Sequence, residues 1–391
     1  MPSVDYILNM PGFTIKQVSG YQPLRLDVVY RRVPRCGHCE SKCVRKKASF
    51  MREVHHETVG HRRIILRFKA YKLYCHDCRR YSNQRFPGIG KYQRATDRLH
   101  AQVFFEHTDG ISQKRLSERF KVGKSTIERW YHRRYSLADK ELSSSQIPTV
   151  LGIDEHFFSR KQGYATTLCD LRNHKVFDIV KGKSESSLSN YFANIPDKSR
   201  VKVICMDLCS SYRSIVKRHF PHAKIVADRF HVIRLLHHQC MATYRQLDTD
   251  IKHNRGLLGA LRKKPERLTD KQRKRRDDYL LQHPAIATVY HFKQQLYDLL
   301  MKKMLTRRRC QPLIPVLLDM IKQLKQSPFK SLRTLGKTLY NWREEIVCMW
   351  RFTKNNGITE GFHRKMKLIQ RRAYGFKNFE NYRMRVRVLC C

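Results

Sequence analysis

The spacing of apolar positions changes along the chain. In the first 90 residues, "HRRIILRFKAYKLY" (61–74) alternates loosely between polar and apolar side chains, which predicts a strand. From residue 149 onward, "TVLGID", "VKVICMD" and "AKIVAD" are nearly continuous apolar runs, typical of central strands in a sheet covered on both faces. Helical spacing replaces these runs after residue 231, as in "LIPVLLDMIKQL". The pattern therefore predicts a strand with alternating side chains first, a sheet covered on both faces next, and a helical segment last.

A helix-turn-helix is predicted in "ISQKRLSERFKVGKSTIERWYHRRYS" (111–136). Apolar residues lie four apart before the break "KVG" and three apart after it, as in two short helices joined by a turn that contains glycine. The second helix would present several side chains to the major groove of DNA, although a basic helical hairpin used only for packing is the alternative. These side chains are Lys124, Ser125, Thr126, Glu128 and Arg129.

The expected fold class is a multidomain protein with a mixed α/β core. Over residues 149–231 the sequence predicts, in order, a strand, a hairpin of two strands, a helix, a strand, a helix, a strand and a helix. An all-α segment interrupts this core before its final helix. The expected domains are 1–90 (zinc-binding), 91–142 (helix-turn-helix), 149–231 (first part of the core), 232–350 (all-α insertion) and 351–391 (final helix and C-terminal segment), with the linker "SSSQIP" at 143–148.

Charge indicates the partner. The chain has 391 residues, with 80 Lys and Arg against 33 Asp and Glu and a formal net charge of +47. Such an excess repels itself unless a polyanion neutralises it, and nucleic acid is the obvious polyanion. The rival is an acidic membrane surface, but the sequence has no run of about 18 apolar residues and no N-terminal signal pattern. We therefore expect a cytoplasmic, DNA-associated protein with no membrane contact.

Four of the thirteen cysteines form two CxxC pairs, "CGHC" and "CHDC". Without a secretory signal, metal binding is favoured over disulfides, and four thiolates at this spacing match tetrahedral structural zinc. The predicted ligands are Cys36, Cys39, Cys75 and Cys78. Ordinary thiols are the alternative, and Cys43, His38, His55 and His76 are substitute ligands that we do not favour singly.

Acids are scarce, so their positions are informative. Asp154 and Asp207 each end an apolar run, and a carboxylate at the end of a buried strand is costly unless it is paired or binds a cation. Glu360 lies at the start of a helix in "NNGITEGFHRKMKLIQRRAYGFKNF" (355–379). Three carboxylates would suit Mg²⁺ or Mn²⁺. For each acid, a turn, cap or ion-pair role remains an alternative, and Asp228 competes with Asp207.

The helix of Glu360 is otherwise basic. His363, Arg364, Lys367 and Arg371 share its face, so we expect the acid to bind metal while the basic neighbours hold DNA phosphates. Two ions about 4 Å apart can activate a water and stabilise the leaving 3′ oxygen of a phosphodiester. Of the other acids, Glu155 would point to the opposite face of its strand, and Asp170 and Asp178 would lie on the surface of a hairpin.

The order of these motifs resembles the ISL3 family of bacterial insertion-sequence transposases. The resemblance is carried by the two CxxC pairs, the helix-turn-helix, "GIDE", "MDLCSSY", "DRFHV" and "TEGFHRKMKLIQRRAYGFKNFENYRMRV", and it spans nearly the whole chain. It implies a DDE recombinase with an RNase H-like core, in which Asp154, Asp207 and Glu360 are the catalytic acids. It also implies that Asp228 and His231 support the site. His363 departs from the family pattern, where Asn is common.

The resulting hypothesis is a DNA transposase that binds the terminal inverted repeats of its own element. It would hydrolyse a phosphodiester to free a 3′-OH and then transfer that strand into target DNA, with two Mg²⁺ or Mn²⁺ ions per site, structural Zn²⁺, and a dimer or higher oligomer on double-stranded DNA. The alternatives are a non-catalytic DNA-binding regulator derived from a transposase, a nuclease that cuts without joining, and an RNA-binding protein.

Overall fold

The computed structural model describes three stretches of the chain, residues 8–143, 146–352 and 357–391. It forms two compact units: the N-terminal unit is Met1–Glu141 with Arg372–Gly375, and the C-terminal unit is Leu142–Arg371 with Phe376–Cys391. The expected linker at 143–148 and the start of the segment 355–379 lie partly outside the described residues. No helix in the described stretches is long and apolar enough to cross a membrane.

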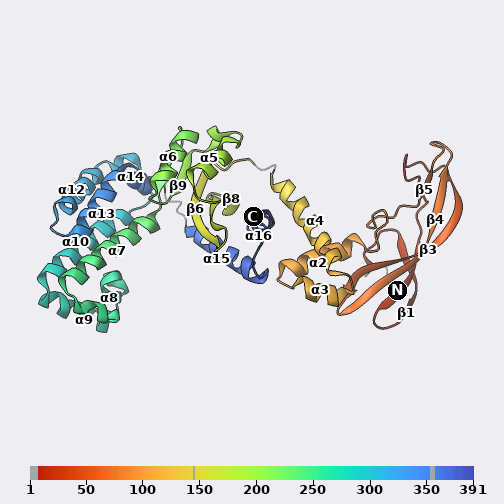
Figure 1. The fold of residues 1–391 in the computed structure, drawn as a ribbon, viewed down its shortest axis with the longest axis horizontal. Helices are drawn as coiled ribbons and strands as arrows, with labels where there is room; N and C mark the ends of the chain where they lie inside the picture. The colour runs from red at the N-terminus through yellow and green to blue at the C-terminus, as the bar shows by residue number, and fades with distance from the viewer. Residues whose placement is uncertain (1–7, 144–145, 353–356) are drawn as a thin grey trace. The chain divides into compact units, whose positions relative to one another are not determined.

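A twisted sheet forms the first half of the N-terminal unit (Figure 1). Its strands run in the order β1-β2-β4-β3, and β5 pairs with the other end of β4. The strands are β1 (Phe13–Ser19), β2 (Leu24–Tyr30), β3 (Val44–Val59), β4 (Arg62–Cys75) and β5 (Tyr81–Asn83). The strand predicted over 61–74 is confirmed, because Ile64, Leu66, Phe68 and Ala70 alternate into the core of the unit.

Three helices complete the N-terminal unit: α2 (Asp97–Thr108), α3 (Gln113–Phe120) and α4 (Lys124–Ser143). Ser112 caps α3 by accepting from the Arg115 N–H, and Lys121 ends the helix in the left-handed conformation at φ 52°. Leu116, Phe120 and Ile127 are buried. The predicted two helices and their short turn are therefore confirmed.

The C-terminal unit is built on a second five-stranded sheet, in the order β10-β9-β6-β7-β8. Its strands are β6 (Val150–Ser159), β7 (Gly163–Asp170), β8 (Lys175–Lys181), β9 (Val203–Met206) and β10 (Lys224–Ala227). The first three form an antiparallel meander, whereas β9 and β10 run parallel to β6. With α5 (Glu185–Ala193) and α6 (Ser210–His219), the element order predicted for the mixed α/β core is confirmed.

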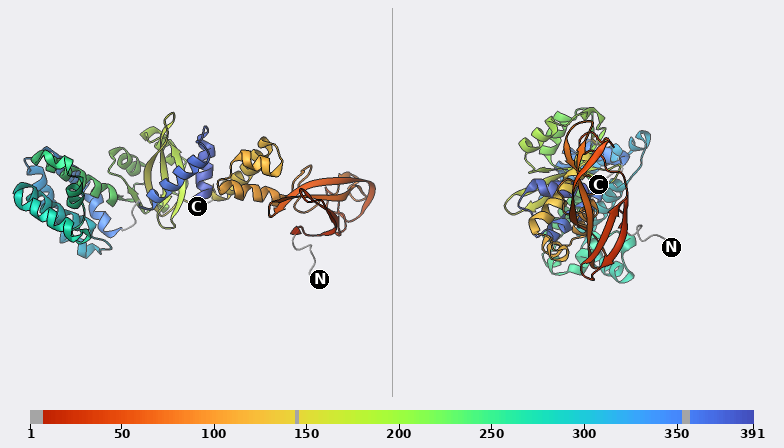
Figure 2. Two further views of the ribbon diagram at one scale, coloured as in Figure 1. Left: turned by 90° about the horizontal axis from the view of Figure 1, so that it is seen from below. Right: turned by 90° about the vertical axis from the view of Figure 1, so that its right-hand side faces the viewer.

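Helices cover both faces of this sheet, as the left panel of Figure 2 shows. One core includes Ile153 and Leu168 of the sheet with Leu188 of α5 and Ile215 of α6. The other core joins the opposite sheet face to α15 (Gly357–Arg372) and α16 (Phe379–Leu389). Because side chains alternate along a strand, residues two apart in β6 face the same pair of helices.

The described residues between β10 and α15 form helices and no strands. The α-helices are α7 (Arg229–Leu247), α8 (Arg255–Arg262), α9 (Asp270–Gln282), α10 (Pro284–Met301), α11 (Arg307–Cys310), α12 (Leu313–Gln326), α13 (Lys330–Asn341) and α14 (Arg343–Arg351). Trp342 and Trp350 are buried in this bundle. Arg229 donates to the carbonyls of Met349 and Lys302, which ties the start of α7 to the far end of the bundle.

Two expectations about acids are wrong. Asp154 does not end its strand, since β6 continues to Ser159 beside β7; only the parallel pairing with β9 stops, at Ile153. Asp178 is not on the surface, because it is 6% exposed and accepts hydrogen bonds from Arg383 and from the Tyr191 hydroxyl, all at 2.7 Å. This buried pair fastens α16 to β8, and nothing in the hairpin sequence indicates it.

Candidate active site

Two of the three predicted acids meet at the edge of the central strands. Asp154 lies at the first position of β6 beyond its pairing with β9, and Asp207 follows the last residue of β9 directly. Parallel neighbours bring these two positions side by side. Asp154, Asp207 and His231 each have a ligand atom within 4.8 Å of the others. The parallel pairing of β6 with β9 thus places two carboxylates close together, and His231 of α7 joins them.

The contacts of the two carboxyl groups differ. Asp154 Oδ1 accepts from the Glu155 N–H at 2.8 Å. Asp207 Oδ2 lies 3.1 Å from His231 Nδ1, whereas Asp207 Oδ1 is buried without a hydrogen-bond partner among the described residues. Asp228 caps α7 at its N-terminus, and its carboxylate is 3.7 Å from His231 Nε2. A buried carboxylate oxygen without a partner fits a site that receives a cation.

Burial raises the pKa values of both carboxyl groups. The pKa of Asp154 rises to about 7, with added repulsion from Asp228, Glu155 and Glu360 and partial compensation by the Glu155 N–H. The pKa of Asp207 rises to about 8, because burial is reinforced by the charges of Asp154 and Asp228. Two adjacent acids in this state retain protons near neutral pH, and a divalent cation would displace those protons.

Glu360 does not join this group within the described residues. It is exposed near the start of α15, and its Oε1 accepts from Arg364 at 3.0 Å, four residues along the helix. The expectation that three carboxylates converge on one point therefore holds for two of them in this structure. Glu360 is close enough for its charge to raise the pKa of Asp154. Glu360 is therefore paired with Arg364, one of the basic residues that we expected to hold DNA phosphates.

A line of hydrogen bonds leads from α16 to His363, whose imidazole lies beside Asp154. The Tyr382 hydroxyl is 2.8 Å from His156 Nε2, and His156 Nδ1 is 2.9 Å from the Thr167 hydroxyl. The same hydroxyl is 3.1 Å from His363 Nε2, and His363 Nδ1 lies 3.8 Å from Asp154 Oδ2. These four side chains, which we call the relay, come from α16, β6, β7 and α15.

When Asp154 is ionised, the donor and the acceptor of each hydrogen bond in the relay are fixed. Burial lowers the pKa of His156 to about 3 and that of His363 to about 4, so each imidazole is neutral and carries one N–H. An ionised Asp154 only accepts, so the His363 proton belongs on Nδ1 and Nε2 must accept from Thr167. The hydroxyl of Thr167 then accepts from His156 Nδ1, and His156 Nε2 accepts from Tyr382.

Our sequence reasoning missed most of the relay. His156 could have been found, because it lies two residues after Asp154 and therefore shares its strand face. Thr167 pairs opposite Asp154 across two antiparallel strands, a register that the sequence does not display. The ring of Tyr382 packs against Phe158 and Phe379. Its hydroxyl has a second role that depends on where α16 docks.

The four predicted zinc ligands also come together, in the N-terminal unit. The sulfurs of Cys36 and Cys78 are 3.6 Å apart, and those of Cys39 and Cys75 are 3.5 Å apart. Sulfurs around a tetrahedral ion with bonds of about 2.3 Å are separated by about 3.8 Å, so the cluster fits zinc. None of the substitute ligands belongs to the cluster within the described residues.

The backbone around each CxxC pair supports this geometry. Glu40 and Arg79, which directly follow the second cysteine of each pair, have φ values of 57° and 55° in the left-handed region. The turn after each pair therefore brings backbone N–H groups toward the sulfurs. Burial alone would raise the pKa of Cys36, but hydrogen bonds from the Cys39 and His38 N–H groups and from the Cys78 and Cys39 side chains together outweigh it and lower that pKa to about 6. A thiolate is the form that binds metal.

The predicted DNA-binding side chains lie on two helices. Lys124, Ser125 and Arg129 are exposed in the first two turns of α4, where Arg129 also bonds the half-buried Thr126 hydroxyl at 3.1 Å. Arg364, Lys367 and Arg371 are exposed on α15. His363, expected on the same basic face, is instead turned toward the sheet. The exposed start of α4 suits contact with a major groove.

Comparison with known proteins agrees with this arrangement. A family model described as "Transposase" matches residues 151–386, more than half of the chain, and the model of the "Helix-turn-helix domain of transposase family ISL3" matches residues 84–135. The "Transposase for insertion sequence element IS1001" of Bordetella parapertussis is 27% identical over 369 residues, which cover 91% of this chain and 88% of that protein. The chain therefore belongs to the ISL3 family of transposases.

Proposed function

We propose that this chain is a DDE-type transposase that cuts and joins DNA at the ends of its own element. The observation that carries the proposal is the pair Asp154 and Asp207, set side by side with one buried oxygen left without a partner among the described residues. The sheet order β10-β9-β6-β7-β8, an antiparallel meander extended by two parallel strands, supports an RNase H-like core with the helices of residues 232–350 as its insertion.

Asp154 and Asp207 would hold Mg²⁺ or Mn²⁺, and Glu360 is the proposed third acid. When bound, the cations would activate a water for hydrolysis and stabilise the leaving 3′ oxygen. His231 and Asp228 orient the Asp207 carboxylate, and the bond from Thr167, the preceding member of the relay, orients His363 toward Asp154. To bind the metal, the exposed Glu360 carboxylate must leave its ion pair with Arg364. Its position on the first turn of α15 allows this movement.

Recognition of the terminal inverted repeats is assigned to the start of α4. Lys124, Ser125, Thr126 and Arg129 would contact base edges and phosphates, while Arg364, Lys367 and Arg371 on α15 would hold the DNA strand near the acids. A 3′-OH freed by hydrolysis would then attack target DNA at the same site, since both steps are in-line displacements at phosphorus. Handling two ends together favours a dimer or higher oligomer.

A cleavage and joining assay tests this function. Purified chain, Mg²⁺ or Mn²⁺ and a labelled duplex carrying the element's end should give metal-dependent nicks and joined products. Asp207→Asn and Glu360→Gln should lose both by more than about a thousandfold while end binding survives. Asp170→Asn, at the end of β7 and bonded to its own turn, is the matched control and should behave like the parent.

Two other outcomes would replace the proposal. Specific end binding with no cleavage in any protein would indicate the DNA-binding regulator. Cleavage of branched duplexes without joining, and without dependence on the end sequence, would indicate the nuclease.

A further inference from the structure

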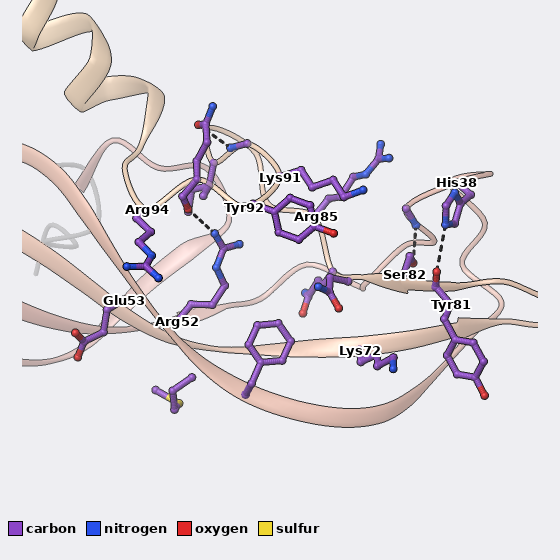
Figure 3. A pocket seen from close by; sticks show the side chains of 18 residues that line it. His38, Arg52, Glu53, Lys72, Tyr81, Ser82, Arg85, Lys91, Tyr92 and Arg94 are labelled. Carbon is purple, nitrogen blue, oxygen red and sulfur yellow. Dashed lines mark hydrogen bonds between the residues drawn. The ribbon is translucent and has the colours of Figure 1, made fainter. Parts of the chain in front are cut away.

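We propose that a groove in the N-terminal unit binds a single DNA strand with an unpaired base stacked on Tyr92. The groove has a volume of about 590 Å³ and is lined by the strands β3–β5, the Cys36–Cys39 turn and the loop 85–94 (Figure 3). Its lining includes Gly37 and His38, which lie between two of the proposed zinc ligands, and ends at Arg94, three residues before α2. The inference rests on the proposed DNA partner but not on cleavage.

The charge of the groove is suited to a phosphate chain. Five of its side chains are cationic: Arg52, Lys72, Arg85, Lys91 and Arg94. One acid, Glu53, also lines it, and its carboxylate is 3.7 Å from the Arg67 guanidinium. Four of the five cations are exposed, so they are accessible to phosphate oxygens. A groove with this excess of positive charge attracts a polyanion rather than an acidic or apolar small molecule.

The feature that distinguishes this groove from ordinary basic surface is its aromatic lining: Tyr92, Tyr81 and Phe50, of which Tyr92 is the most exposed. Tyr92 is 78% exposed, and Figure 3 shows its ring in the groove beside Lys91 and Arg85. The Lys91 ammonium is 5.0 Å from the ring centroid. In a duplex the faces of the bases are covered by their neighbours, so such a ring has nothing to stack on. An unpaired base offers that face, and cation-flanked aromatic rings are how proteins hold single strands.

The loop that carries Tyr92 is held in place before any ligand arrives. Tyr92 has φ 60°, a left-handed conformation that is strained for a bulky residue. Two donors from β3 hold the residues after Tyr92: the Arg52 guanidinium donates to the Gln93 carbonyl at 2.7 Å, and the His55 N–H donates to the Arg94 carbonyl at 2.9 Å. Across the turn, the Gln93 N–H donates to the Gly90 carbonyl at 3.1 Å. The exposed ring is thus presented on a fixed support, which lowers the entropy cost of stacking a base.

Binding of labelled oligonucleotides to the full chain tests the proposal. The probes are a 16-nucleotide oligothymidylate and a 24-base-pair duplex carrying the element's end, followed by fluorescence anisotropy. Tyr92→Ala should weaken oligothymidylate binding about tenfold and leave duplex binding within twofold, because base stacking contributes about 1–3 kcal/mol. Tyr92→Phe keeps the ring and should retain the affinity. Arg129→Ala, on α4, should show the opposite selectivity.

Tyr21→Ala is the matched control. Tyr21 is 70% exposed in the same unit with the Arg62 guanidinium 4.0 Å from its ring, yet it does not line the groove. Equal effects of Tyr21→Ala and Tyr92→Ala, or no effect of Tyr92→Ala, would overturn the proposal. An equal loss of duplex and oligothymidylate binding would overturn it too, and would assign the groove to a duplex backbone. Each outcome is independent of the cleavage assay, so the function can stand if the groove fails.

Discussion

The two units each gather a set of metal-ligating side chains, and the sets differ in almost every respect. Four sulfurs meet in the N-terminal unit and fill a tetrahedral shell by themselves, as structural zinc sites do. In the C-terminal unit two carboxyl groups and an imidazole meet, with an oxygen of Asp207 still available. Hard oxygen donors and an incomplete shell leave room for water and phosphate.

This difference separates stability from chemistry. Soft thiolates select zinc, and a closed shell offers no position to a substrate. The acid pair resists ionisation in its buried setting, since pKa values of about 7 and 8 leave it protonated near neutral pH. We therefore expect damage to the first set to unfold one unit and damage around the second set to slow a reaction.

The largest expected effect follows loss of the thiolate set. Cys36→Ser should abolish bound zinc and destabilise the N-terminal unit by on the order of 5–10 kcal/mol, because metal binding free energy becomes folding free energy. Amide hydrogen exchange should accelerate in β3 and β4 and stay unchanged in β6 and β9. Cys43→Ser is the control, because Cys43 is exposed in the same segment and lies outside the cluster.

Two outcomes would contradict the stabilising role of the thiolate set. If Cys43→Ser and Cys36→Ser had the same effect, or if zinc loss left exchange in β3 and β4 unaltered, the cluster would not hold the unit together.

Breaking the relay should slow cleavage without unfolding either unit. Thr167→Val removes the hydroxyl that joins His156 to His363, and outer partners of metal ligands typically contribute 10–100-fold to activity or metal affinity. We expect a 10–100-fold lower cleavage rate at saturating DNA and a matching increase in the Mn²⁺ concentration required. DNA affinity should not change.

Thr166→Val supplies the matched control for this substitution. Thr166 is the preceding residue of β7, is equally buried, and bonds the Gly182 carbonyl at 2.9 Å on the other face of the sheet. If the effect of Thr167→Val were purely structural, Thr166→Val would slow cleavage equally. Only slower cleavage in Thr167→Val, with the shifted Mn²⁺ requirement, agrees with positioning of Asp154.

Acid should weaken the N-terminal unit through a buried histidine that lies outside both metal sets. Burial lowers the pKa of His56 to about 4, outweighing the Leu8 carbonyl, with Arg98 adding repulsion. The unfolded chain takes up a proton near pH 6.5 and the folded chain does not until about pH 4, so stability is complete above 6.5 and falls as pH decreases toward 4. Between pH 7 and 5 the loss is about 1–2 kcal/mol.

Urea unfolding at each pH measures this loss, and His56→Gln isolates it. The variant should be less stable at pH 7, because the bonds to Leu8 and Thr96 are altered, but its stability should change less between pH 7 and 5. An unchanged pH dependence in His56→Gln would assign the acid sensitivity to other groups of the unit, namely the thiolates or His100, whose pKa burial also lowers to about 4.

The smallest effect is expected at the ion pair that occupies Glu360. Arg364→Gln removes an exposed pair four residues apart on a helix, which contributes at most about 0.5 kcal/mol to stability. Cleavage at saturating DNA should persist in Arg364→Gln and disappear in Glu360→Gln. Equal retention in both variants would show that the acid only neutralises its helix, and the catalytic set would then consist of the two aspartates and His231.

Local pattern was sufficient for much of the fold. The CxxC spacing, the helix-turn-helix and the order of strands and helices in the core depend on residues close together in the chain, and each was predicted. Asp207 was placed correctly because a short apolar run ends directly before it. The groove lining also comes from a short range of sequence, but its hollow shape and the exposure of Tyr92 appear only once β3, β5 and the loop 85–94 pack together.

The sequence by itself determined which groups are available: two pairs of thiols, two aspartates after apolar runs and an acid on a basic helix. Only the tertiary structure decided which of them meet. The relay joins His156 and Tyr382, 226 residues apart, and Thr167 and His363, 196 residues apart. Such contacts depend on strand register and on how α15 and α16 dock against the sheet. The same docking paired Asp178 with Arg383 and left Glu360 beside Arg364, because side-chain partners are set by packed faces and not by distance along the chain.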